Sequence, residues 1–99
     1  MDINIRTINH PNPEKFRAYA EEELQDTLGE SDLITTCNLH LTKEDRVPVI
    51  YKVVIEVHPK GRTPIAGSDE DEIAHQAVAN SIKKVQKQLR RYTEKRKER

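Results

Sequence analysis

Apolar and polar residues alternate in three stretches of the chain, which indicates strands. In "MDINIRTI", Ile3 and Ile5 alternate with polar residues, as expected of a half-buried strand. The runs "LITTCNLHL" and "VIYKVVIEV" are rich in β-branched residues and flank the charged stretch "TKEDRVP". They predict an antiparallel hairpin in which Leu41 pairs near Val49. The residues expected on its inward face are Leu33, Cys37, Leu39, Leu41, Tyr51, Val53, Ile55 and Val57.

The segment between the first strand and the hairpin has a helical period. Phe16, Ala20, Leu24 and Leu28 recur every four residues along one face. Asn12 is a suitable N-cap, Pro13 suits the first helical position, and Gly29 can close the end. We therefore expect a helix that begins at Pro13.

After the hairpin, the pattern predicts a short strand and a long helix. "TPIAG" suggests a short strand, and Pro64 favours an edge position for it. "SDEDEIAHQAV" predicts a helix start with Ser68 as cap and with acidic residues at the positive end of the helix dipole. The helical pattern continues to about Tyr92. Its apolar stripe consists of Ala74, Val78, Ile82, Val85, Leu89 and Tyr92.

These elements occur in the order βαβββα, which predicts an α+β fold. Two helices would cover one face of a four-stranded, mostly antiparallel sheet, as in a double-stranded-RNA-binding domain. The length suits a single domain, expected over residues 1–92, followed by a basic, frayed end at 93–99.

The net charge of zero conceals a polarised chain. Residues 1–79 hold eight Lys or Arg and fifteen Asp or Glu, whereas residues 80–99 hold nine and two. On a helical projection, the side opposite the apolar stripe gathers Lys83, Lys84, Lys87, Arg90 and Arg91. Such cations repel one another, and a polyanion would relieve that repulsion. Cations at a helix C-terminus are also favoured by the dipole, so RNA or DNA binding is one of two explanations.

The stretch "HQAVANSIKKVQKQLRRYTEK", together with the element order, resembles the ribosome hibernation-promoting factor family. This family is also called ribosome-associated inhibitor Y or the sigma-54 modulation proteins, and its last helix carries a "YAAID…KL.RQL.K.K" pattern. The resemblance implies binding to the small ribosomal subunit in the mRNA and tRNA channel, which silences translation in stress or stationary phase. Since the chain stops soon after the last helix, it resembles the family's short form.

The resemblance also implies which residues contact the ribosomal RNA backbone. Lys84, Lys87, Arg91 and Lys95 match the family pattern, and Lys83 and Arg90 lie on the same ridge of the helix. Recognition would then depend on charge and backbone shape, without sequence specificity.

The first helix departs from the family pattern. It carries Glu23 and Asp26 where lysines are usual, and Lys15 and Arg17 are its only cations. One alternative is therefore a protein–protein interaction module, in which the acidic first helix of one copy docks on the basic helix of another to give a homodimer. Another is a double-stranded RNA binder with an unrelated role.

Other kinds of chemistry are poorly supported. The four histidines lack metal-ligand spacing, Cys37 reads as a small core residue, and "DEDE" at 69–72 lacks the glycine of a calcium loop. The sequence has neither a Gly-rich phosphate loop nor a nucleophile motif. We therefore expect no enzyme activity, cofactor, metal or small-molecule substrate. With one cysteine, no signal peptide and no membrane-spanning run, a cytoplasmic protein is expected.

Overall fold

The computed structural model describes residues 1–29 and 31–97, and for residues 92–97 it describes the course of the backbone only. The element order βαβββα is as expected, and the fold is α+β. The elements are β1 (Asp2–Ile8), α1 (Pro13–Leu28), β2 (Ile34–Glu44), β3 (Ile50–Pro59), β4 (Ile65–Asp71) and α2 (Ala74–Lys97).

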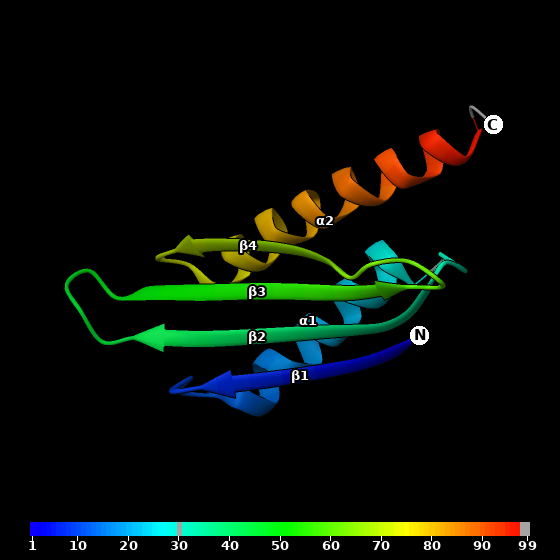
Figure 1. Cartoon of the computed structure of the whole chain (residues 1–99). Helices are drawn as coiled ribbons and strands as arrows, with labels where there is room; N and C mark the ends of the chain where they lie inside the picture. Colours follow the sequence, from blue (N-terminus) through cyan, green and yellow to red (C-terminus); the bar gives the residue numbers. More distant parts are fainter. Residues whose placement is uncertain (30, 98–99) are drawn as a thin grey trace.

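The four strands form one sheet in the order β1-β2-β3-β4, so β1 and β4 are its edges. β1 runs parallel to β2, and the other neighbours are antiparallel. Both helices lie on the same face of the sheet (Figure 1). The core lies between the sheet and the helices, and the other face of the sheet is open.

Helix α1 forms where its capping signals predict. The Asn12 side chain accepts a hydrogen bond from the backbone N–H of Lys15 at 3.3 Å, and Pro13 opens the helix. Phe16, Ala20 and Leu24 are buried against the sheet, and so is Leu28. The period of four residues therefore identified the buried face correctly.

The hairpin is confirmed, but its predicted register is wrong. Leu41 pairs with Val53 rather than with Val49, because β2 continues to Glu44 and it is Glu44 that pairs with Ile50 at the start of β3. A register shift between Ile34 and Thr36 also turns Ile34 into the core, while Leu33 stays partly exposed. The local irregularity thus moves the buried position by one residue.

The predicted start of the second helix at Ser68 is also wrong. Strand β4 continues to Asp71, and the helix begins only at Ala74. Asp69 and Glu70 pair with Val53 and Lys52 across the ladder to β3. The strand is favoured because it satisfies backbone groups along a neighbouring strand, which a local cap cannot do. The "DEDE" residues therefore do not lie in the first turn of the helix.

Helix α2 packs across β3 and β4 through the predicted stripe as far as Leu89, and the side chain of Tyr92 lies outside the described residues. Val78, Ile82 and Val85 are buried, and Ala74 and Leu89 are partly buried. Two small residues missed by the stripe, Ala77 and Ser81, are buried as well. The Ser81 hydroxyl donates to the carbonyl oxygen of Ala77 at 2.8 Å, so its burial leaves no polar group unsatisfied.

Gly67 allows this close packing between α2 and β4. A Cβ atom at this position would lie 2.7 Å from the carbonyl oxygen of Ser81 and 3.0 Å from a methyl group of Val85. The backbone of a packed helix cannot easily move away from such a contact. Residue 67 therefore has to be small for the helix to lie at its present distance from the strand.

We expect Gly67→Ala to lower the free energy of unfolding by roughly 1–3 kcal/mol, because the added methyl group overpacks the interface between β4 and α2. Urea denaturation followed by circular dichroism measures this change. Ser68→Ala, on the opposite face of the same strand, is the matched control and should change stability by less than about 0.5 kcal/mol. Equal effects of the two substitutions would contradict the packing argument.

Candidate nucleic-acid interface

The cations predicted on α2 are exposed in the structure. Lys83, Lys84, Lys87, Arg90 and Arg91 all lie on the solvent side of the helix. The 24 residues of α2 span about 36 Å, whereas the seven residues of β4 span about 23 Å. The C-terminal part of α2 therefore extends beyond β4, and Figure 1 shows it projecting away from the sheet. A groove in a polyanion could accommodate this projecting part.

Lys84 differs from the other cations, because the fold uses it. Its Nζ donates to the carbonyl oxygen of Ser68 at 2.6 Å and lies 3.5 Å from a carboxylate oxygen of Asp69. One turn further along, Nε2 of Gln88 donates to the carbonyl oxygen of Ala66 at 2.7 Å. Lys84 and Gln88 thus hold α2 against the outer edge of β4. The cationic ridge is accordingly Lys83, Lys87, Arg90 and Arg91.

Asp69 completes the polar contact between β4 and α2. Its carboxylate accepts a hydrogen bond from Nδ2 of Asn80 at 2.9 Å. This hydrogen bond and the charge of Lys84 hold the pKa of Asp69 below its usual value, against a smaller opposing effect of burial. Asp69, which was expected among the acidic residues at the N-terminal end of the helix, instead contacts Asn80 and Lys84 from the strand.

Lys15 and Arg17 are exposed on the N-terminal half of α1, away from the ridge. The rings of Tyr19 and His75 stack with centroids 3.7 Å apart, and Nε2 of Gln86 donates to the carbonyl oxygen of Thr27 at 3.4 Å. The two helices therefore run parallel and side by side. By helix geometry, Lys15 lies about 18 Å along the axis from the start of the ridge. The structure does not bring these two groups of cations together.

The acidic half of α1 lies alongside the ridge instead. Because the helices run parallel, residues 21–28 of α1 are level with the middle of α2. Glu21, Glu22 and Asp26 are exposed there and, with Ala18 and Gln25, line a shallow hollow on the outer side of α1. Glu23 faces Tyr19, and burial and this carboxylate raise the pKa of the Tyr19 hydroxyl. An anion that approaches α2 from the side of α1 would be repelled.

Lys95, the last predicted contact residue, lies on α2, but its side chain is outside the described residues. Two further cations were missed by the sequence reasoning. Lys60 and Arg62 lie in the turn between β3 and β4, at the end of the molecule where α2 projects (Figure 1). The signal is present in "HPKGR", where two cations flank a glycine.

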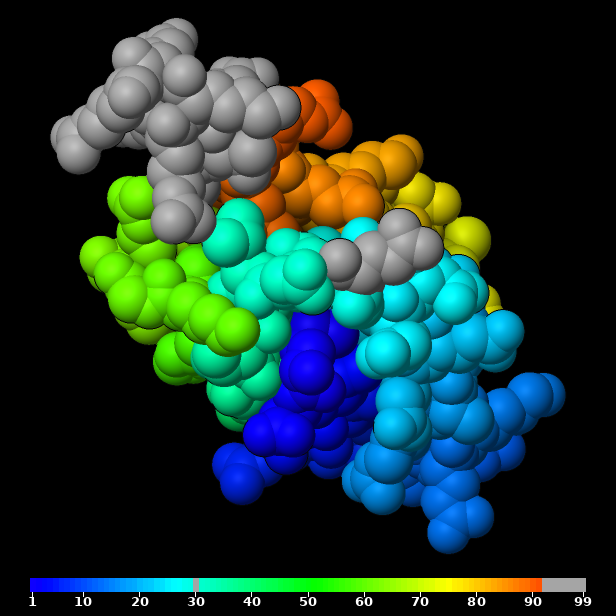
Figure 2. Space-filling view, turned by 90° about the vertical axis from the view of Figure 1, so that its right-hand side faces the viewer, coloured from blue at the N-terminus to red at the C-terminus, as the bar shows by residue number. Residues whose placement is uncertain are grey.

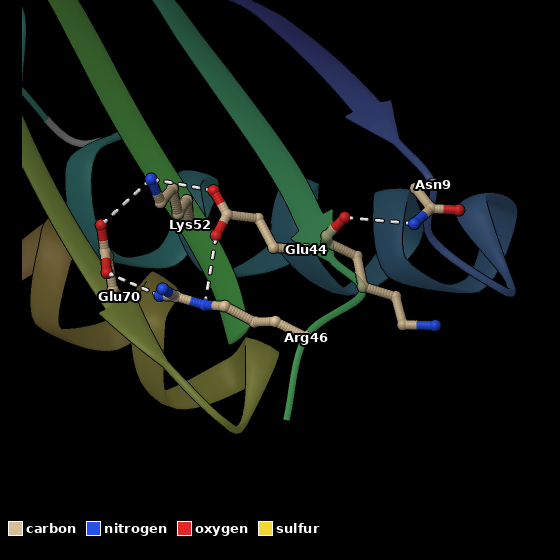
Figure 3. A network of polar contacts seen from close by, with 6 residues as sticks. Asn9, Glu44, Arg46, Lys52 and Glu70 are labelled. Atoms are coloured by element: carbon tan, nitrogen blue, oxygen red, sulfur yellow. Dashed lines mark hydrogen bonds and ion pairs between the residues drawn. The ribbon is translucent and has the colours of Figure 1, made fainter. Parts of the chain in front are cut away.

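Two other cations, Lys52 and Arg46, lie at the open face of the sheet and are neutralised there. Figure 3 shows Lys52 and Arg46 between the carboxylates of Glu44 and Glu70. The nitrogen–oxygen distances in this closed ring run from 2.9 to 3.6 Å. The hydrogen bond from Lys52 lowers the pKa of Glu44, and the same contact raises the pKa of Lys52. The ring ties the loop between β2 and β3 to β4.

Cys37, His40 and His58, the side chains considered for catalysis or metal binding, all lie in the hairpin of β2 and β3. Cys37 is fully buried in the core, and burial raises the pKa of its thiol to about 11. His40 lies opposite Val54 and His58 opposite Thr36, so the two histidines are four residues apart along the hairpin. Within the described residues, no group of three or more His, Cys, Asp or Glu is placed to hold a metal ion. No helix in residues 1–29 and 31–97 is long and apolar enough to cross a membrane.

Fold and surface define a small α+β domain with a projecting cationic helix. Over residues 3–97 the sequence matches the family described as sigma 54 modulation protein / S30EA ribosomal protein. The chain belongs to this family, which confirms the resemblance indicated by its last helix.

Solved structures agree with this assignment at the level of the fold. A ribosomal subunit interface protein from Coxiella burnetii matches with a TM-score of 0.79 and 18% identity, over 94% of this chain and 98% of that one. The N-terminal domain of Thermus thermophilus Protein Y matches with a TM-score of 0.76 and 18% identity, over 93% and 99%. No curated protein sequence matches the chain.

We expect Lys84→Met to lower the free energy of unfolding by about 1 kcal/mol, because it removes a charged donor from a strand-edge carbonyl. Lys87→Met, at an exposed position three residues further on, should change it by less than about 0.5 kcal/mol. Urea unfolding of both variants at the same salt concentration measures the difference. A loss of stability in Lys87→Met as large as in Lys84→Met would show that Lys84 has no special structural role.

Proposed function

We propose that this protein associates with the ribosome and inhibits translation by occlusion, without catalysis. Its site would be the mRNA and tRNA channel of the small subunit, and its place of action the cytoplasm. Membership of the family supports ribosome association, since the family description and a structural neighbour both refer to ribosomal proteins. The observation that carries the proposal is the exposed ridge of Lys83, Lys87, Arg90 and Arg91, which runs along α2 from its contact with β4 toward its projecting end.

The chemistry of this ridge suits an RNA backbone. Its guanidinium groups can bind phosphate oxygens in pairs, and its lysines add point charges. Binding would displace counterions from the RNA, so affinity should fall steeply as salt rises. Lys95, Lys60 and Arg62 would extend the same surface. Among the described side chains, Phe16, Tyr19 and Tyr51 pack inside or against the core, so contacts would be to phosphates rather than to stacked bases.

The acidic half of α1 constrains how the protein would dock. Phosphates next to Glu22 and Asp26 would be repelled, so RNA should approach from the C-terminal end of α2 and the turn between β3 and β4. Lys15 and Arg17 could reach RNA only as a second, separate contact. This geometry differs from docking on two parallel basic helices.

We expect the triple variant Lys87→Glu, Arg90→Glu, Arg91→Glu to lose most co-sedimentation with vacant small subunits at low salt. The wild-type affinity should fall with a steep salt slope, and the triple variant should reduce that slope by about three, since each phosphate contact contributes about one. Lys84 is left intact so that folding is not disturbed. Lys15→Glu with Arg17→Glu is the comparison variant and should weaken binding less.

Small subunits filled with mRNA and tRNA test the occlusion itself. These should bind the wild-type protein more weakly than vacant subunits, because the channel is taken. Equal pelleting with filled and vacant subunits would contradict occlusion. Equal pelleting of the wild type and the triple variant would contradict the assignment of the ridge.

A second candidate function is a protein–protein interaction module, and the parallel arrangement of the helices favours it. With an acidic α1 and a basic α2 side by side, a two-fold axis along the helices would place each α1 on the α2 of a second copy. Both contacts would then be charge-complementary. This dimer would cover the ridge and exclude RNA.

We expect the helix-to-helix dimer, if it forms, to be stable at low salt and to dissociate as salt rises, because its attraction is between exposed charges. Glu22→Lys with Asp26→Lys should abolish it at every salt concentration. Sedimentation velocity over a range of salt measures both effects. A monomer at the lowest salt rules this candidate out.

A further inference from the structure

The two edge strands of the sheet differ in whether the backbone groups on their outer sides have hydrogen-bond partners. At β4, the carbonyl oxygens of Ala66 and Ser68 accept hydrogen bonds from Gln88 and Lys84, so α2 occupies that edge. At β1, no strand within the described residues pairs with the outer side, and none of their side chains hydrogen-bonds to its backbone. Figure 2 shows the dark-blue residues of β1 at the molecular surface between α1 and β2. This edge offers unpaired N–H and C=O groups to another strand.

The sequence of β1 is complementary to its own reverse. "DINIR" at residues 2–6 reads acid, isoleucine, asparagine, isoleucine, base. When two copies pair antiparallel with Asn4 opposite Asn4, Asp2 lies opposite Arg6 of the second copy, and Arg6 lies opposite Asp2 of the second copy. In the same register, Ile3 lies opposite Ile5 of the second copy, and Ile5 lies opposite Ile3 of the second copy. Two ion pairs and two apolar pairs form together, and such cross-strand pairs are the unit of sheet stabilisation.

The exposure of these side chains fits the pairing. Asp2, Asn4 and Arg6 are exposed on the open face, whereas Ile3 and Ile5 lie on the helix side and are only partly buried. Residues directly opposite one another in a sheet point to the same face, so charges would meet charges and isoleucines would meet isoleucines. The second copy would cover apolar surface that the isolated chain leaves open.

Alternative registers are less favourable. A shift by one residue turns the isoleucines of one copy toward the open face. A shift by two residues places Asp2 opposite Asn4 or opposite Ile8 of the second copy, and both ion pairs are lost. The pattern therefore favours a single register.

We propose that the edge of β1 is a self-association surface, through which two copies join their four-stranded sheets into one continuous sheet. The two-fold axis is normal to the sheet, so both pairs of helices lie on the same face of the dimer. The ridge on α2 lies over the opposite edge of each sheet, and it remains accessible. This self-association surface is independent of ribosome binding and differs from the helix-to-helix contact considered above.

The test uses single and mixed charge variants of the full chain. Asp2→Arg places arginine opposite Arg6, and Arg6→Asp places aspartate opposite Asp2, so each variant alone should dimerise at least about tenfold more weakly than the wild type. A mixture of the two variants restores both ion pairs, and a heterodimer should form with about the wild-type affinity. The double variant Asp2→Arg, Arg6→Asp should also dimerise. Asp32→Arg and Lys60→Asp, which change the same charges elsewhere on the surface, should have no effect.

Sedimentation equilibrium gives the dimer affinities, and amide hydrogen exchange locates the contact. Exchange at residues 2–6 should slow as the wild-type concentration rises, but not in Asp2→Arg alone. A monomer at every soluble concentration overturns the proposal. Failure of the mixed variants to associate also overturns it. A dimer that survives Asp2→Arg but is lost on Glu22→Lys with Asp26→Lys assigns the interface to the helices and likewise overturns it.

Discussion

The packing of α2 across β4 is the interaction on which the rest of the structure depends. Gly67 lets the helix come close to the strand, and the Lys84 and Gln88 side chains bond to carbonyl groups along its outer edge. Asp69 of the strand adds a further contact, because its carboxylate accepts a hydrogen bond from Asn80 of the helix. These contacts hold the helix firmly over the sheet and cover an edge that would otherwise invite pairing. Because the helix is longer than this strand, its C-terminal end extends beyond β4, where it projects away from the sheet (Figure 1).

That projection separates charges of different roles along one helix. Lys84 lies over β4 and is used to hold the fold together, whereas Lys87, Arg90 and Arg91 lie nearer the projecting end and remain exposed. The acidic half of α1 next to the ridge restricts the direction from which a polyanion can approach. On the open face, Lys52 and Arg46 are neutralised by Glu44 and Glu70. A basic stretch of sequence thus becomes a directional surface, although the net charge of the chain is zero.

Much of this architecture could be predicted from the sequence, because it depends on neighbours a few residues apart. The cap at Asn12, the four-residue period of α1 and the apolar stripe of α2 each reflect local geometry, and each was confirmed, the stripe as far as Leu89. The exposed side of α2 followed from the same projection. The alternation in β3 identified Val53, Ile55 and Val57 as core residues for the same reason. The order of the elements then left few possible folds.

Residues far apart in the sequence decided the rest. Asp69–Asp71 carry good local signals for a helix start, yet pairing with β3 and contacts with Asn80 and Lys52 keep them in a strand. The hairpin register and the inward turn of Ile34 depend on how two strands align over their whole length. The sequence alone determined which face of α2 is basic, since helical periodicity is a local property. Only the tertiary structure decided which of its cations are free, because the partner of Lys84 lies sixteen residues away on the edge of the sheet.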